Sequence, residues 1–247
     1  MITTHGGLFE GIGGFSLGAK RCGLTTKWIC ELDKYRRNIL RKNISDAHQF
    51  KNIRTTKSPP PVDLITGGFP CQNISTAGGR SGIIGTESQL WFEYLRIIYE
   101  VQPRYVIIEN STQLRNAGIE FILYDLSKIG YDAEWECLQA SQFGYRHKRE
   151  RCFIVAYPSE IRRNQIGNVQ IFKEINEILG DTYRPVDLSM PIKRFNRATN
   201  SNDVRNNYGF SKGLDRNRIA AIGDAVSPDI AEYIIKCIKL FDSITKK

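Results

Sequence analysis

The sequence predicts an α/β protein built on a doubly wound, mostly parallel sheet, and three observations support this fold class. Residues 1–158 alternate short apolar runs with amphipathic stretches, the pattern of a parallel sheet that helices cover on both faces. The chain has 247 residues, which suits one large domain with a small appendage. Its hydrophobic content of 41% is ordinary for a protein with a buried core.

Predicted strands and helices alternate along this part of the chain. The strand candidates are residues 27–31, 62–66, 105–109, 133–138 and 152–157, with a weaker one at 2–5. Amphipathic periodicity predicts helices at residues 15–22, 34–42, 88–101 and 119–129. Gly23 and Gly130 follow two of these helices in the position of a C-terminal cap.

The composition changes after Pro158. Residues 159–207 are polar and rich in Asn and Arg, with one short amphipathic stretch at 169–179, and they are too few for a core of their own. Apolar periodicity returns at Ile219 and continues over 230–241, which predicts a last helix packed on the main sheet. We therefore expect a main domain over 1–158, a small subdomain over 159–207, and a segment over 208–247 that returns to the main domain.

The chain is basic, with a net charge of +9, and two clusters hold much of the excess. Residues 193–218 contain seven Lys or Arg against two Asp, and residues 146–151 contain four Lys or Arg. Two such runs favour a nucleic acid partner as strongly as a merely solvated surface. No apolar run approaches the ~18 residues of a membrane span, and residues 1–14 lack a signal core, so we expect a cytoplasmic protein.

One cysteine stands apart from the others. The six cysteines and three histidines form no cluster at metal-ligand spacing, so we expect no metal site. Cys71 follows Pro70 in the run GGFPCQNIS, directly after a predicted buried strand, and Gly67 and Gly68 are expected to keep this loop open. Open α/β sheets place their chemistry at this edge, which makes Cys71 the candidate nucleophile. The remaining cysteines lie among apolar residues and are expected in the core: Cys22, Cys30, Cys137, Cys152 and Cys237.

A glycine-rich turn, LFEGIGGFSLG, joins the first predicted strand to the first helix. Gly11, Gly13 and Gly14 let the backbone approach a ligand, and the helix N-terminus offers free N–H groups. Ser16 stands where the dinucleotide motif has its third glycine, so the turn is not a GxGxxG motif. Glu31 ends the next strand about twenty residues later, where an acidic side chain can bind ribose hydroxyls. Loop and carboxylate together indicate a nucleoside-containing cofactor.

Charged side chains also flank two later strands. Glu109 ends a buried strand, where loss of solvation raises the pKa of a carboxyl group and favours its protonated form. Arg149 and Arg151 lie at alternate positions before the strand at 152–157, so both are expected on one face, where they can fix a phosphate or an oxygen-rich ring edge. A thiol, a protonatable carboxyl and an arginine in one crevice would suit covalent activation of a pyrimidine.

Seven blocks of this sequence, taken in order, resemble the characteristic blocks of the cytosine-C5 DNA methyltransferases, nearest to small bacterial and phage-type members. The resemblance covers residues 1–158 and about 205–241, and it implies an S-adenosylmethionine-dependent methyltransferase fold with residues 159–207 as a small target-recognition region. The blocks are LFEGIGGFSLG, ICELDKY, GGFPCQNIS, SQLWFEYLRI, IIENS, FGYRHKRERCFIVAYP and GDAVSP.

The resemblance implies a covalent mechanism. The Cys71 thiolate would add to C6 of a cytosine flipped out of the duplex. Glu109 would hydrogen-bond the N3 and amino edge of the base, Arg151 its O2 edge, and Arg149 would support the site. C5 would then take the methyl group from S-adenosyl-L-methionine, and loss of the C5 proton would free the thiol.

The resemblance also implies binding residues, with residues 78–82 as the loop that closes over the base. Asn52 and Asp224 depart from the family pattern, which usually has Asp and Asn there, and each changes a polar contact to the cofactor. Ser111 and His147 replace a common Val and a common Gln. Residues for S-adenosyl-L-methionine would be Phe9, Gly11, Gly13, Glu31, Leu32, Asn52, Ile53, Pro70, Leu90, Asp224, Ala225 and Val226. Residues for DNA would be Gln72, Ser75, Gly79, Arg80, Arg194, Arg197 and Arg205.

Two other functions stay open. One is the same chemistry on tRNA, although the Cys-Phe-Thr signature of that branch is absent. The other is a catalytically idle DNA-binding or regulatory protein, against which the intact set of Cys71, Glu109 and Arg151 argues. We expect a monomer acting on double-stranded DNA, and the sequence leaves open the recognised DNA site and whether a cognate restriction endonuclease acts beside it.

Overall fold

The computed structural model describes residues 1–70, 88–116, 118–145, 147–163, 170–172 and 212–245. Its strands are β1 Thr4–Leu8, β2 Thr25–Cys30, β3 His48–Phe50, β4 Leu64–Gly68, β5 Tyr105–Ser111, β6 Tyr131–Gln139 and β7 Glu150–Pro158. Within the described residues they form one sheet in the order β3-β2-β1-β4-β5-β7-β6. Neighbours from β3 to β5 are parallel, whereas β7 runs antiparallel to β5 and β6.

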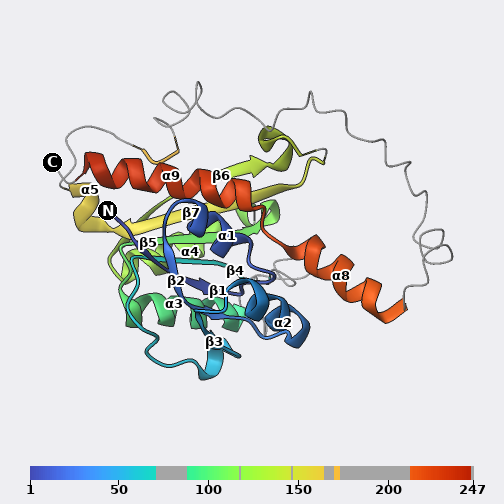
Figure 1. Ribbon diagram of the computed structural model, residues 1–247. Coiled ribbons are helices and arrows are strands. Elements are labelled where there is room, and N and C mark those ends of the chain that lie inside the picture. Colours follow the sequence, from blue (N-terminus) through green and yellow to red (C-terminus); the bar gives the residue numbers. More distant parts are fainter. Residues whose placement is uncertain (71–87, 117, 146, 164–169, 173–211, 246–247) are drawn as a thin grey trace.

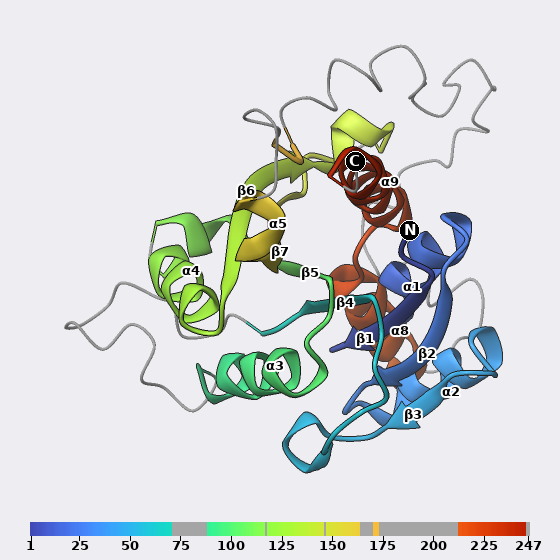
Figure 2. The ribbon, with the colours of Figure 1, turned by 90° about the vertical axis from the view of Figure 1, so that its left-hand side faces the viewer.

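Helices cover both faces of this sheet. Helices α1 (Gly14–Arg21) and α9 (Pro228–Ile244) lie on one face, and α3 (Ser88–Val101) and α4 (Ile119–Lys128) lie on the other (Figure 1, Figure 2). Each layer buries its own apolar cluster against the strands, which confirms the doubly wound fold. The described residues also form the helices α2 Lys34–Asn43, α5 Ser159–Arg163 and α8 Lys212–Asp224 and the 3₁₀ turns η1 Ile53–Thr55, η2 Thr112–Arg115 and η3 Ala140–Phe143.

The strands and helices predicted within residues 1–158 are present, with small shifts at their ends. The largest shift is at β1, which was predicted at 2–5 and lies at Thr4–Leu8. Gly23 and Gly130 adopt φ angles of 78° and 85°, which confirms the predicted helix ends. Strand β3 was not predicted, because three residues are too few to show alternation.

Gly67 and Gly68 belong to β4, so the prediction that they keep a loop open was wrong. A Cβ on Gly67 would lie 2.7 Å from the carbonyl oxygen of Leu8. A Cβ on Gly68 would lie 2.4 Å from Oε2 of Glu109. Both distances are shorter than van der Waals contact, so the glycines are needed for close packing of neighbouring strands and of one carboxyl group.

Four of the five cysteines expected in the core are buried, and the fifth is partly buried. Cys137 lies on the edge strand β6 and packs against the cluster beneath α3 and α4. No disulfide is formed among these five thiols. The four buried cysteines are Cys22, Cys30, Cys152 and Cys237.

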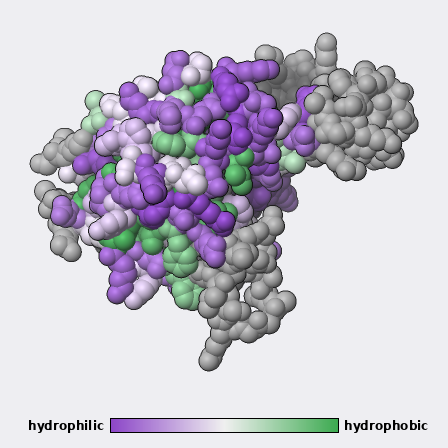
Figure 3. Space-filling view, turned by 90° about the horizontal axis from the view of Figure 1, so that it is seen from below, coloured by the Kyte–Doolittle hydropathy of each residue, from purple (hydrophilic) through white to green (hydrophobic). Residues whose placement is uncertain are grey.

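The side of the molecule that carries α2, β3 and α3 is mostly hydrophilic, with smaller hydrophobic patches between (Figure 3). Phe92 and Tyr99 of α3 are among the exposed large hydrophobic residues. Within the described ranges, no helix has both the length and the apolar character needed to cross a membrane.

The described parts of residues 159–207 pack beside the main sheet. Ser159 donates a hydrogen bond from Oγ to Asp132 of β6 over 3.0 Å. The backbone N–H of Ile171 donates to Glu134 of β6 over 2.8 Å, and the Ile171 side chain is buried in the cluster under α1 and α9. Helix α5 and residues 170–172 are thus anchored to the main sheet. The domain boundary that we expect after residue 158 stays a prediction.

Substitution of Asp242 is expected to destabilise the fold strongly. This buried carboxylate of α9 accepts hydrogen bonds from Arg104 over 2.5 Å and from Tyr105 over 3.2 Å. Asp242→Ala should lower the free energy of unfolding by about 3 kcal/mol, because it leaves a partly buried guanidinium without its partner. Lys236→Ala, which breaks an exposed ion pair on the same helix, should cost under about 1 kcal/mol. Denaturant unfolding measures the free energy of unfolding of both variants. Equal losses in the two would contradict this expectation.

Candidate active site

A cavity of about 1020 Å³ opens at the carboxyl ends of β1, β2, β4 and β5. Its lining combines residues from the start of the chain, such as Phe9, with residues near its end, such as Val226. Nearly all described residues of the predicted cofactor and base sites line this one cavity. They are Phe9, Gly11, Glu31, Leu32, Asn52, Ile53, Pro70, Leu90, Asp224, Ala225 and Val226, together with Glu109, Arg149 and Arg151.

Gly13 is the exception, since it does not line the cavity. It precedes α1 with a φ of 99°, and a Cβ there would lie 3.2 Å from Cδ2 of Leu40 on α2. The residue therefore provides the left-handed turn into the helix and the room for α2. By contrast, Phe9 has a φ of 51° and does line the cavity, so a non-glycine residue holds a strained backbone at this site.

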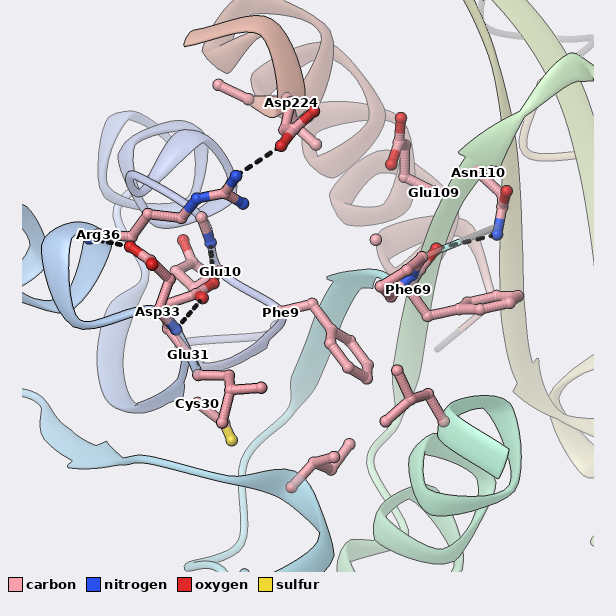
Figure 4. Close-up of a pocket in the computed structure, with 18 of the residues that line it drawn as sticks. Phe9, Glu10, Cys30, Glu31, Asp33, Arg36, Phe69, Glu109, Asn110 and Asp224 are labelled. Atoms are coloured by element: carbon pink, nitrogen blue, oxygen red, sulfur yellow. Dashed lines mark hydrogen bonds and ion pairs between the residues drawn. The ribbon is translucent and has the colours of Figure 1, made fainter. Parts of the chain in front are cut away.

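Glu31 is fixed at the cavity by two backbone amides. Its Oε2 accepts a hydrogen bond from the N–H of Gly11 over 2.8 Å, and its Oε1 accepts from the N–H of Asp33 over 2.8 Å (Figure 4). Asp33 in turn caps α2 by accepting from the N–H of Arg36 over 2.8 Å. A carboxylate has about four lone-pair positions, so Glu31 keeps acceptor capacity for hydroxyl groups of a ligand.

A second carboxyl group, which the sequence reasoning did not assign, lies beneath the glycine-rich turn. Glu10 is 4% exposed, and its Oε1 accepts a hydrogen bond from the N–H of Ser16 over 2.9 Å. Burial raises the pKa of Glu10 to about 7, against the opposing effect of its hydrogen bonds to Ser16. A Cβ on Gly7 would lie 2.0 Å from Oε2 of Glu10, so Gly7 makes the room for this carboxyl. The signal in the sequence was an acid inside a glycine-rich turn.

Glu109 and Arg151 come together from two antiparallel strands. The Nε of Arg151 lies 3.0 Å from Oε1 of Glu109, and β5 and β7 pair side by side at this point. Burial raises the pKa of Glu109, and the charges of Arg151 and Arg149 oppose that rise without cancelling it. The predicted protonatable carboxyl is therefore consistent with the direction of this shift.

Asn110 anchors the chain that leads to the candidate nucleophile. Its Nδ2 donates to the carbonyl of Phe69 over 3.2 Å, and its Oδ1 accepts from the N–H of Ser111 over 2.7 Å. The side chain thus holds the end of β4 against β5, immediately before Pro70. Cys71 itself lies outside the described residues, and so do the predicted DNA contacts Gln72, Ser75, Gly79, Arg80, Arg194, Arg197 and Arg205.

The two arginines predicted to act together have different partners. Arg151 pairs with Glu109, whereas Arg149 donates a hydrogen bond from Nη1 to the carbonyl oxygen of Gly223. Burial lowers the pKa of Arg149, and the neighbouring charge of Arg151 lowers it further. Sequence spacing put both on one face, but it could not indicate a backbone acceptor far along the chain.

The two positions that depart from the family pattern each have a local partner. Asn52 caps η1, because its Oδ1 accepts from the N–H of Arg54 over 3.0 Å. Asp224 lies at the end of α8, and its Oδ2 is 2.5 Å from Nη2 of Arg36 on α2 (Figure 4). Arg36, which the sequence reasoning did not single out, thus joins two elements at the cavity.

Comparison with known proteins agrees with this geometry. The family model described as C-5 cytosine-specific DNA methylase matches residues 4–219. The type II methyltransferase M.CviJI of Paramecium bursaria Chlorella virus IL3A is 33% identical over 163 residues, which are 64% of this chain and 44% of that protein. M.NgoBI of Neisseria gonorrhoeae, also a type II methyltransferase, is 30% identical over 224 residues, which are 88% of this chain and 64% of that protein.

The chain therefore spans between about two fifths and two thirds of the curated relatives it matches first. A solved structure of similar size also shares its fold. The Entamoeba histolytica methyltransferase EhMeth superposes with a TM-score of 0.66 at 17% identity, covering 99% of each chain.

Proposed function

The chain belongs to the C-5 cytosine-specific DNA methylase family, and from this premise we propose that it methylates C5 of a cytosine flipped out of duplex DNA. The observation that carries the proposal is that the Glu109–Arg151 pair and the Glu31 carboxylate line one cavity. The pair proposed to bind a base edge and the carboxylate proposed to bind ribose hydroxyls therefore face the same cavity. Methyl transfer between a nucleoside cofactor and a base needs this arrangement.

On the base side, the residues supply a nucleophile, a proton and a cation. The Cys71 thiolate bonds to C6, and the protonated carboxyl of Glu109 donates to N3 as negative charge develops on the ring. Arg151 holds Glu109 in place and faces the O2 edge. After C5 has gained its methyl group, a base removes the C5 proton, the C5–C6 double bond forms again, N3 returns its proton to Glu109, and the sulfur–C6 bond breaks to free the Cys71 thiolate.

On the cofactor side, the cavity suits S-adenosylmethionine, which would supply an electrophilic methyl group on a sulfonium sulfur. Glu31 retains acceptor sites for the ribose, and Phe9, Ile53 and Leu90 supply apolar surface for the adenine and sulfonium regions. Gly11 presents its backbone where the methionine portion would lie. The buried carboxyl of Glu10 lies beneath the turn, and the hydrogen bond that it accepts from the N–H of Ser16 holds the start of α1 in place.

We propose that residues 159–207 form the target-recognition region and that Arg194, Arg197 and Arg205 contact the duplex. The Arg, Asn and Gln content of this segment suits phosphate and base-edge contacts. The net charge of +9 supports a polyanionic partner. Gln72, Ser75, Gly79 and Arg80 follow the candidate nucleophile in sequence and are proposed to contact the flipped base and its neighbours.

Expression of the gene in a host without cytosine-C5 methylation should introduce 5-methylcytosine at one short sequence context. Methylation-sensitive sequencing of the host DNA would reveal both the activity and the target site. The purified protein, incubated in parallel with DNA and with tRNA, should label DNA only. Transfer to tRNA alone would favour the RNA alternative, and DNA binding without any transfer would favour the idle homologue.

A further inference from the structure

Residues 223–226, termed here the closing segment, comprise the end of α8 and the start of its link to α9, and Asp224, Ala225 and Val226 line the cavity. One end of this segment is fixed by the backbone, since a Cβ on Gly14 would lie only 2.1 Å from the carbonyl oxygen of Val226. The other end is more exposed. A Cβ on Gly223 would have no atom within 4 Å, and the Asp224 side chain is 64% exposed. Side chains from two other elements contact this exposed end.

Two arginines from different elements hold it. Arg36, in the first turn of α2, forms an ion pair with Asp224 over 2.5 Å (Figure 4). Arg149, directly before β7, donates to the carbonyl oxygen of Gly223. The first contact is to a side chain and the second to the backbone, so together they fix both the position and the orientation of the segment.

Arg36 is connected to the predicted cofactor residues through a series of hydrogen bonds. Gly11 donates to Glu31, Asp33 donates to Glu31, and Asp33 accepts from the N–H of Arg36 in the first turn of α2. Each of these bonds is 2.8 Å long. The ion pair with Asp224 extends the series across the cavity to the closing segment. A ligand held by Glu31 would thus lie beside the residues that secure the segment.

Arg149 lies close enough to Glu109 for their charges to interact, but it has a different hydrogen-bond partner. Arg151 pairs with Glu109, and the charge of Arg151 opposes a second guanidinium at that carboxyl. The hydrogen bond to Gly223 gives Arg149 a neutral acceptor instead. Two arginines that lie two residues apart in the sequence therefore bind different partners, one a carboxyl group and the other a backbone carbonyl.

We propose that Arg149 and Arg36 are positioning residues for the cofactor, which clamp the closing segment over the cavity, and that Arg151 alone serves the target base. The proposal rests on the proposed function and goes beyond it, because the resemblance gives Arg149 only a supporting role at the base site. It predicts that Arg36 and Arg149 determine the affinity for the cofactor, whereas Glu109 and Arg151 determine the rate of the chemical step.

The test measures the dissociation constant of S-adenosylhomocysteine by titration calorimetry, without DNA. Arg149→Ala should raise this constant about tenfold, the effect of losing one hydrogen bond from a charged donor. Arg36→Ala should raise it about two- to fivefold, as suits a partly exposed ion pair. Arg41→Ala, on the exposed side of the same helix, should leave it unchanged. Arg151→Ala should leave it unchanged as well, while lowering kcat for methyl transfer.

A double-mutant cycle tests whether Arg36 acts through Asp224. Arg36→Ala combined with Asp224→Ala should bind S-adenosylhomocysteine no more weakly than the weaker single variant. Effects that multiply would contradict the ion pair as the cause. Arg149→Lys, which keeps the charge and one donor, should bind with an intermediate affinity, and thermal unfolding of each variant would separate loss of affinity from loss of fold.

Two outcomes would overturn the proposal and are distinguishable from each other. If Arg149→Ala lowered kcat as Arg151→Ala does and bound S-adenosylhomocysteine normally, Arg149 would belong to the base side and the clamp would be wrong. If the folded wild-type protein bound no S-adenosylhomocysteine, the proposed cofactor itself would be wrong, and the clamp with it.

Discussion

Cys71→Ala is expected to abolish methyl transfer to DNA while the affinity for S-adenosylhomocysteine stays that of the wild type. Without the thiolate, C6 cannot be attacked and C5 does not become nucleophilic, so the loss should be on the order of 10⁴-fold or more. The cofactor side of the cavity is built from other residues and keeps its contacts. Transfer of a labelled methyl group and titration calorimetry measure the two properties separately.

DNA that contains 5-fluorocytosine provides a positive test of the same residue. Fluorine cannot leave C5 as a cation, so the sulfur–C6 bond should persist after methyl transfer and give a denaturant-stable adduct. Cys71→Ala should form no adduct. Cys137→Ala removes a thiol on the edge strand and should form the adduct normally. An active wild-type enzyme that forms no adduct would count against covalent catalysis.

Glu109→Gln is expected to lower kcat by about 10²- to 10⁴-fold while DNA binding is largely kept. The glutamine amide presents the same donor and acceptor to the N3 and amino edge, but it has no proton to transfer as charge develops on the ring. Glu120→Gln, on the surface of α4, makes the same chemical change away from the cavity and should leave kcat unaltered. Equal rates for wild type and Glu109→Gln would exclude the proton-donor role.

The pH dependence of kcat should distinguish the wild type from Glu109→Gln further. Burial raises the pKa of Glu109, so the protonated form persists to a higher pH than for an ordinary glutamate. If catalysis needs the protonated form, kcat is full below this pKa and falls as the pH rises through it. Glu109→Gln should lack this descending limb, because its amide does not titrate.

The sequence predicted the fold well where long apolar runs carried the signal. No polar residue interrupts the apolar run directly before Glu109. In the structure β5 is buried along most of its length, as a central strand should be. The predicted helix at 88–101 coincides with α3. Strand β3 was not predicted, because it forms by pairing with β2 and carries no local sequence pattern of its own.

Most described residues that the sequence suggested for the site line one cavity, but the sequence did not predict how they pair. Nothing local distinguishes Arg149 from Arg151, because their partners are a backbone carbonyl near the end of the chain and a carboxyl on a neighbouring strand. Arg36 was overlooked for the same reason, since its partner Asp224 is distant in sequence. Gly68 was expected to keep a loop open, whereas it lies in β4 and makes room for Glu109.

The packing of α9 on α1 has a consequence for how this protein is made. Gly14 and Gly18 of α1 allow the backbone around Val226 and Ala231 to approach closely, so the cavity receives its last wall from residues that follow most of the sheet in the chain. During translation, the sheet strands leave the ribosome well before Val226 does. The nascent chain therefore stays without a complete cavity until that residue has emerged and docked, so no ligand that needs this wall can be bound before then.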